Sequence, residues 1–337
     1  MRPMAMMRGV AIGGFGALLA ACGGGDGNGA TGGYSPYTVA ELSFAVDGSE
    51  AELNLASADA VLAAALSAVA GANAVVARNL GGLDIGANPP GRGVIPCVVG
   101  SVAETVAVDA GSGQRTVTLD SSQCFDPNSG SDQNGSLQLV YVRPSAALAS
   151  GTLSFGASPA SYTFSLPEIG TGDYNFRQAR GDVRFQGEFD GSPSASQTHE
   201  FSLIIGRGPR STTGAAFSPS RQIEVQLGTT GIDYEVTVSG SGGSQSLTAS
   251  GPLFLRGSGS TLVPACNFAA SVDVATNTAL VIGVGDGIAR GGMLSLSTAS
   301  GTATVSFDAS GNAVVTPSSG VPQSYPASTV ASFCGVF

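Results

Sequence analysis

The sequence predicts a mainly β protein whose antiparallel sheets form a sandwich or a partly open barrel, with one alanine-rich helix near the N-terminus. From about residue 91 to the C-terminus, apolar and polar residues alternate with period two, which is typical of half-buried strands. Glycine, serine, proline and asparagine separate these segments, as turn residues do. Only residues 57–82 follow a helical pattern, so the sequence lacks the crossover helices that a parallel sheet requires.

The chain begins with the pattern of a secretory signal. Arg2 and Arg8 precede an apolar run over residues 9–19, and small residues then lead to Cys22. A basic start, a short apolar core and small residues before the cleavage point are typical of secretory signals. The apolar run is about half as long as a membrane-spanning helix requires, so we expect residues 1–21 to be removed.

Residues 19–22, Leu-Ala-Ala-Cys, resemble the lipobox of bacterial lipoproteins. The resemblance implies that the thiol of Cys22 receives a lipid and that this residue becomes the mature N-terminus. Gly23 in place of an aspartate implies export to the outer membrane of a Gram-negative cell. Residues 22–37 are rich in glycine, so we expect them to form a flexible tether between the lipid anchor and the folded region.

Residues 57–82 carry the signals of a buried helix. Ser57 can cap the N-terminus, Asp59 suits the first turn, Arg78 suits the last turn and Gly81 can end the helix. No charged residue lies between Asp59 and Arg78, but alanine dominates the segment. We therefore expect a helix packed closely on a sheet and not a second membrane span.

Strands between residues 136 and 256 carry many aromatic side chains on one face, and a single helix cannot cover so much apolar surface. These faces must pack on another sheet, close into a barrel or line a ligand cavity. If they line a cavity, we expect the ligand to contact Tyr162, Phe164, Phe185 and Tyr234.

Four cysteines remain once Cys22 is assigned to the lipid. An even number in an exported chain indicates two disulfides, and four cysteines allow three pairings. We expect the sequential pairing, Cys97 with Cys124 and Cys266 with Cys334, which gives two nested units. A zinc site is less favoured, because the chain has no CxxC or HxxxH pair and a single histidine.

Residues 97–142 resemble a pattern found in many uncharacterised proteobacterial lipoproteins. The pattern contains a cysteine, a glycine, a strand, a Gly/Asp turn, a strand ending in a second cysteine, a polar loop and an NGxLxLxY strand. Here it begins at Cys97 and Gly100, reaches the second cysteine at Cys124 and ends with Asn134 to Tyr141. The resemblance implies a disulfide-stapled β-meander and implies no activity.

No motif identifies a catalytic site. The G-x-S-x-G elbow of serine hydrolases is absent, and we expect His199, which precedes an alternating strand, to be a surface strand residue beside Glu200. A calcium ion is the one cofactor that the sequence suggests. Its oxygen ligands would come from a glycine-containing segment: Asp126, Asn128, Asp132 and Asn134. The spacing departs from that of an EF-hand, so a solvated turn is the alternative interpretation.

These observations predict an outer-membrane-anchored lipoprotein with a non-enzymatic structural or binding role in the cell envelope. The alternatives are a carrier of an apolar ligand or lipid, and a hydrolase whose site has no recognised motif. The expected partner is the membrane, through the lipid anchor, and the net charge of −10 argues against a nucleic-acid partner. We divide the mature chain into a β-rich domain, residues 38–256, and a C-terminal β unit, residues 257–337.

Overall fold

The computed structural model describes most of the chain between residue 44 and residue 335. The described residues are 44, 46, 50–75, 97, 99–126, 131–145, 148–156, 161–167, 173–188, 194–209, 219–241, 244–259, 267–283 and 289–335.

Two helices, one 3-10 turn and sixteen strands make up the described fold, and this confirms the predicted fold class of antiparallel β structure with an alanine-rich helix. The helical elements are α2 (Ala58–Val75), α4 (Ala327–Ala331) and η1 (Phe333–Gly335). The strands are β1 (Val99–Val108), β2 (Arg115–Asp126), β3 (Ser131–Val142), β4 (Leu148–Phe155), β5 (Tyr162–Pro167), β6 (Asp173–Glu188), β7 (Ser194–Pro209), β8 (Arg221–Leu227), β9 (Tyr234–Ser241), β10 (Ser244–Gly259), β11 (Phe268–Thr278), β12 (Leu280–Gly283), β13 (Met293–Thr298), β14 (Gly301–Phe307), β15 (Ala313–Thr316) and β16 (Gln323–Tyr325).

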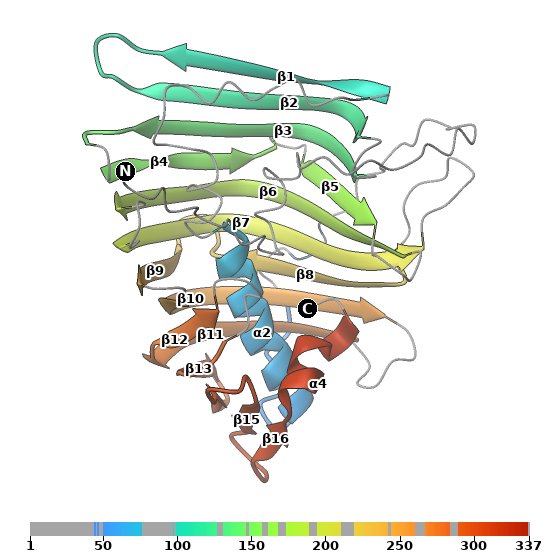
Figure 1. Cartoon of the computed structure of the whole chain (residues 1–337). Helices are drawn as coiled ribbons and strands as arrows, with labels where there is room; N and C mark the ends of the chain where they lie inside the picture. Colours follow the sequence, from blue (N-terminus) through green and yellow to red (C-terminus); the bar gives the residue numbers. More distant parts are fainter. Residues whose placement is uncertain are drawn as a thin grey trace, which may run out of the picture.

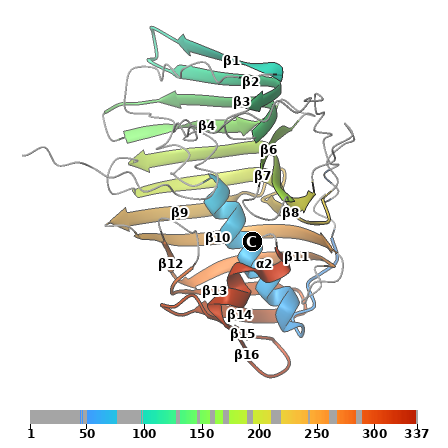
Figure 2. The same ribbon diagram turned by 45° about the vertical axis from the view of Figure 1, so that its right-hand side comes forward.

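All sixteen described strands belong to one sheet, which runs from β1 at one end to β16 at the other (Figure 1). Neighbouring strands pair antiparallel, and most neighbours in the sheet are also neighbours in sequence. The predicted boundary after residue 256 falls inside β10, and pairing continues from β10 to β11 without interruption. One face of this sheet packs against α2 in front of β8 to β15, as Figures 1 and 2 show. We call this the inner face and the opposite one the outer face.

A line of residues with positive φ crosses the sheet where the strands change partners. Gly181 is the clearest case, because its φ is 101° and a Cβ there would lie 2.2 Å from the carbonyl oxygen of Glu200. Residues 174–179 of β6, which precede Gly181, pair with β5, and residues 181–188 pair with β4. The same change occurs in β7, which pairs first with β9 and then with β8. Only glycine adopts such a conformation at little cost, so these positions allow the sheet to bend. We call it the glycine line, and it comprises Gly100, Gly135, Gly156, Gly181, Gly228 and Gly251, together with the non-glycine residue Gln123, whose φ is 46°.

The helix α2 is buried on nearly all sides, as expected of a helix that is apolar all round. Its first turn matches the prediction, because the amide of Ala60 donates to the Ser57 hydroxyl at 3.4 Å and Asp59 follows the cap. Gly71 allows a close approach to the sheet, since a Cβ there would lie 2.9 Å from Cδ1 of Leu227 on β8. The predicted helix is confirmed over Ala58–Val75, and residues 76–82 lie outside the described residues. Within the described part of the chain, no helix is long and apolar enough to cross a membrane.

The described residues between 44 and 53 cross the outer face before the chain reaches α2. The amide of Val46 donates to Oε1 of Glu224 on β8 at 2.9 Å in a buried position. Glu50 then forms an ion pair with Arg256 on β10. A short parallel bridge to β11 follows, and the chain continues to α2 on the inner face. Both faces of the sheet are therefore partly covered by the same N-terminal part of the chain.

Candidate functional site

The inner face carries a small group of polar side chains within the apolar core. On β7, Gln197 and His199 alternate with the outward-pointing Thr198, and they share their face with Phe201. The antiparallel pairing of β7 with β9 places Tyr234 directly opposite His199. Gln197, His199 and Tyr234 are each at most 1% exposed. We call these three residues the buried polar cluster.

Five side-chain atoms of the buried polar cluster have no hydrogen-bond partner among the residues that the structure describes. They are both amide atoms of Gln197, both ring nitrogens of His199 and the hydroxyl of Tyr234. Buried polar groups are nearly always paired in folded proteins, and each group left unpaired costs about 1–3 kcal/mol. Such a concentration of unpaired groups on two adjacent strands is the feature of this core that requires an explanation.

Apolar and aromatic side chains surround the buried polar cluster. The rings of His199 and Tyr234 are perpendicular, with centroids 6.1 Å apart, and the ring of Phe201 lies 6.5 Å from that of His199. Phe155 packs against Phe201 at 5.2 Å. On the other side of β7, Val183 of β6 is the register partner of His199. The cluster is therefore a polar patch within the packed core, flanked by aromatic rings and by Val183.

Burial determines the protonation states of the buried polar cluster. Loss of solvent lowers the pKa of His199 to about 3 and raises the pKa of Tyr234. At neutral pH the imidazole is therefore uncharged, with one nitrogen as a donor and the other as an acceptor. The three side chains together present neutral donors and neutral acceptors, and no charge.

The structure corrects the prediction that His199 is a surface strand residue, because its side chain is 0% exposed. The alternation of β7 explains the difference: His199 lies two residues before Phe201 and therefore on the apolar face. Glu200 points to the outer face, so the two side chains lie on opposite sides of the sheet. Sequence reasoning also missed Gln197, although the same period-two pattern, extended two residues further back, would have placed it in the core.

The four residues predicted to line a ligand cavity all lie in the hydrophobic core of the inner face. Tyr234 belongs to the buried polar cluster, and Phe185 on β6 pairs with Gln197 of that cluster. Tyr162 and Phe164 lie on β5, beyond the glycine line, where the Tyr162 hydroxyl donates to Gln133 at 3.1 Å. The structure therefore brings two of the four residues to the cluster and places the other two across the bend.

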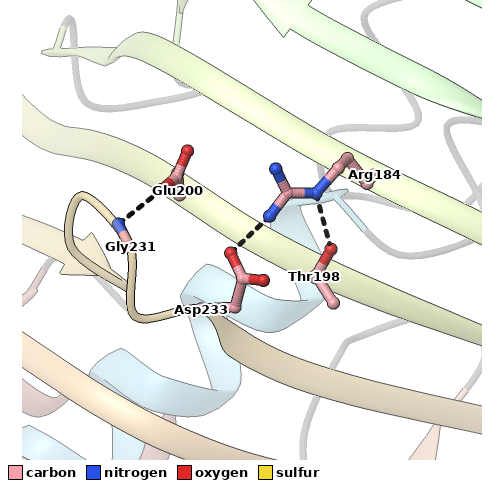
Figure 3. A network of polar contacts seen from close by, with 5 residues as sticks. All are labelled: Arg184, Thr198, Glu200, Gly231 and Asp233. Atoms are coloured by element: carbon pink, nitrogen blue, oxygen red, sulfur yellow. Dashed lines mark hydrogen bonds and ion pairs between the residues drawn. The ribbon is translucent and has the colours of Figure 1, made fainter.

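On the outer face, a polar network fixes the loop between β8 and β9 (Figure 3). Arg184 of β6 forms an ion pair with Asp233, and its Nε donates to the Thr198 hydroxyl at 3.1 Å. The amide of Gly231 donates to Oε1 of Glu200 at 3.1 Å. Side chains of β6 and β7 thus hold the loop over residues 228–233 against the outer face.

Three of the four predicted calcium ligands lie where β2 ends and β3 begins. Asp126 is the last residue of β2, Asp132 and Asn134 belong to β3, and Asn128 lies outside the described residues. The side chain of Asn134 already accepts a hydrogen bond from the amide of Gln123, at 3.1 Å. Among the described residues, no group of three or more His, Cys, Asp or Glu side chains is placed to hold a metal ion. The calcium site stays a prediction.

The predicted disulfide between Cys97 and Cys124 is confirmed, and it joins the residue two positions before β1 to β2 across a Cα–Cα distance of 5.2 Å. Cys334 is also disulfide-bonded, but its partner cysteine lies outside the described residues. The pairing of Cys334 with Cys266 therefore stays a prediction. Cys22, the predicted lipid acceptor, and the predicted tether of residues 22–37 also lie outside the described residues, so both stay predictions.

Comparison of the chain with models of known protein families, with curated proteins and with solved structures finds no match.

Proposed function

We propose that the protein is a lipid-anchored, non-enzymatic binding protein of the cell envelope that carries an amphipathic ligand against the inner face of its sheet. The observation that supports this proposal is the buried polar cluster, whose five polar atoms lie beside aromatic rings and have no hydrogen-bond partner among the described residues. A ligand with an apolar body and a polar head would pair several of these atoms and keep its body among the aromatic rings.

The chemistry of the buried polar cluster favours an uncharged polar group on the ligand. His199 is neutral at physiological pH because burial lowers its pKa to about 3, so the cluster offers no positive charge. Burying a carboxylate or phosphate without an opposite charge costs far more than burying a hydroxyl or amide that gains hydrogen bonds. A hydroxyl or an amide on the ligand can both donate hydrogen bonds to these groups and accept hydrogen bonds from them. An ester can only accept.

The position of α2 suggests where the apolar body of the ligand would lie. Gly71 of α2 packs on Leu227, and Leu227 is the register partner of Phe201 on β7. Phe201 lies two residues after His199 on the same face of β7, so the helix contacts the sheet at the residue pair next to the buried polar cluster. Because the cluster is at most 1% exposed, we expect the ligand to enter by displacing α2 or another covering segment from the inner face.

The anchor in this proposal comes from the sequence. Residues 19–22 resemble a lipobox, and the glycine-rich residues 22–37 would hold the folded region at a distance from the outer membrane. A carrier tethered in this way could exchange an amphipathic ligand with the membrane that holds it.

Replacing His199 with leucine tests the proposal. A pyrene-labelled fatty alcohol and the matching fatty acid serve as probes for the full-length protein in detergent, with fluorescence as the readout. We expect the alcohol to bind more tightly than the acid at neutral pH. The substitution should weaken binding of the alcohol more than tenfold, because it removes two of the polar atoms in the buried polar cluster. It should leave the free energy of unfolding unchanged or higher, since an apolar side chain of similar size leaves no buried nitrogen unpaired.

Ser67→Ala is the matched control, because Ser67 on α2 is also fully buried and its hydroxyl is also unpaired among the described residues. Removal of that hydroxyl should not change the affinity for the fatty alcohol. The proposal is wrong if the wild-type protein binds neither probe, or if Ser67→Ala reduces binding as much as His199→Leu. A loss of binding together with a lower melting temperature in His199→Leu would assign the residue a structural role.

A further inference from the structure

A hollow of about 630 Å³ lies on the outer face, over β2, β3, β4, β6 and β7. We call it the outer groove. A straight row of polar side chains crosses its floor, one from each of these strands in consecutive pairing register. The row consists of Thr118, Gln138, Ser154, Asp182 and Glu200. These side chains alternate with the core residues of the same strands, so the outer groove and the buried polar cluster lie on opposite faces of the sheet.

The side chains around the outer groove are mostly hydroxyls and carboxamides. A second, shorter row lies beside the first, and it consists of Arg180, Ser202 and Gln226 on β6, β7 and β8. Threonines of the loop at residues 229–230 form one wall. Among the described residues that line the groove, the charged ones are one arginine and two carboxylates, which together carry a small negative charge in a protein whose net charge is −10. An anionic ligand would be repelled by this surface.

The floor and the wall of the outer groove are held in place. The floor is a paired antiparallel sheet, so its side chains keep a spacing of about 4.8 Å from one strand to the next. Gln138 donates to the Thr118 hydroxyl at 3.3 Å, which orders two neighbouring positions of the row. The wall is fixed because Glu200 accepts a hydrogen bond from Gly231, and Asp233 pairs with Arg184 (Figure 3). The groove thus presents hydrogen-bonding groups at regular intervals on a rigid surface.

We propose that the outer groove binds a neutral glycan whose chain runs across the strands. A sugar chain carries hydroxyl groups at intervals of about one ring, a distance comparable with the strand spacing of about 4.8 Å. Hydroxyls both donate and accept hydrogen bonds, as do the serine, threonine and glutamine side chains that line the groove. Asp182 and Glu200 are register partners on adjacent strands, and like charges in this position are unfavourable. Sugar hydroxyls that donate to both carboxylates would relieve this repulsion.

A substitution that fills the outer groove tests the proposal. Ser154 lies at the centre of the row, and Ser150 lies on the same strand and the same face but outside the groove. Both serines are half-buried. The full-length protein is applied to a panel of immobilised neutral oligosaccharides of two to six sugars, and the affinity for each oligosaccharide that binds is measured by calorimetry.

We expect the wild-type protein to bind at least one neutral oligosaccharide, Ser154→Tyr to weaken that affinity at least tenfold, and Ser150→Tyr to change it less than twofold. Both tyrosine variants should melt within a few degrees of the wild type, which shows that the sheet is intact. Binding to no member of the panel overturns the proposal, as does equal loss of affinity in the two variants. Binding of a cationic peptide such as pentalysine in place of any glycan would assign the groove to basic peptides. The fatty-alcohol affinity should be the same in Ser154→Tyr as in the wild type, so this test is independent of the proposed carrier function.

Discussion

Replacing His199 with leucine removes the only histidine of the chain and with it the only side chain whose ordinary pKa lies near 6.5. In the folded protein His199 is 0% exposed, and burial lowers its pKa to about 3. In the unfolded chain the imidazole regains a pKa of about 6.5. The two states therefore differ in proton binding between about pH 3 and pH 6.5, and in this range only the unfolded state holds the proton.

The difference in the pKa of His199 between the folded and unfolded states determines how the free energy of unfolding changes with pH. Protonation favours the unfolded state, so the contribution of His199 to the free energy of unfolding is complete above pH 6.5 and is lost as the pH falls below it. One pKa unit corresponds to about 1.4 kcal/mol, so the loss between neutral pH and pH 5 is about 2 kcal/mol. His199→Leu has no group to protonate at this position, and its stability should lack this part of the pH dependence.

Urea unfolding with intact disulfides, measured at several values between about pH 7.5 and pH 5, checks the prediction. The wild-type free energy of unfolding should fall by about 2 kcal/mol more than that of His199→Leu over this range. Carboxylates contribute equally to both proteins, so the difference between them isolates the imidazole. Equal slopes in the two proteins, or an imidazole NMR signal that titrates near pH 6.5 in the folded wild type, would refute the reasoning about burial.

Three further outcomes are expected. Cys22→Ala should abolish incorporation of a labelled fatty acid and release the protein from membranes, and unchanged labelling would contradict the lipoprotein proposal. Non-reducing peptide mapping should find Cys266 joined to Cys334, whereas a free thiol on Cys266 would show that the sequential pairing is wrong. Gly181→Ala should lower the free energy of unfolding by roughly 3 kcal/mol or more, because its Cβ would meet a carbonyl oxygen at 2.2 Å. Gly231→Ala shares the positive φ but has open space around its Cβ, so it should cost only about 1 kcal/mol, and similar costs at both sites would contradict the steric argument.

Substitution of Phe185, one of the residues expected to contact a ligand, would not give a clear test of ligand binding. Phe185 is 4% exposed and packs in the same core, so Phe185→Asp would bury an unpaired carboxylate and unfold the protein. His199→Leu is the more informative change, because it alters the polarity of the cluster and leaves the apolar packing around it.

The sequence by itself determined the local features of this protein. Period-two alternation placed Phe201 and Tyr234 on buried faces, and Ser57 and Asp59 marked the start of α2 correctly. The spacing of turn residues and cysteines gave antiparallel strands with a staple between Cys97 and Cys124. Each of these features depends on neighbours within one strand, one helix turn or one hairpin, where side-chain periodicity and turn chemistry act directly.

Only the tertiary structure decided which residues meet across strands. The pairing of β7 with β9 places Tyr234 against His199, and the change of partner at Gly181 separates Tyr162 from Phe185. Neither result follows from periodicity, because alternation fixes the face of a side chain but not the partner or register of its strand. The outer groove has the same origin, since its floor is assembled from five strands in register. The sites of this protein therefore come from strand pairing, which is determined by packing over the whole sheet.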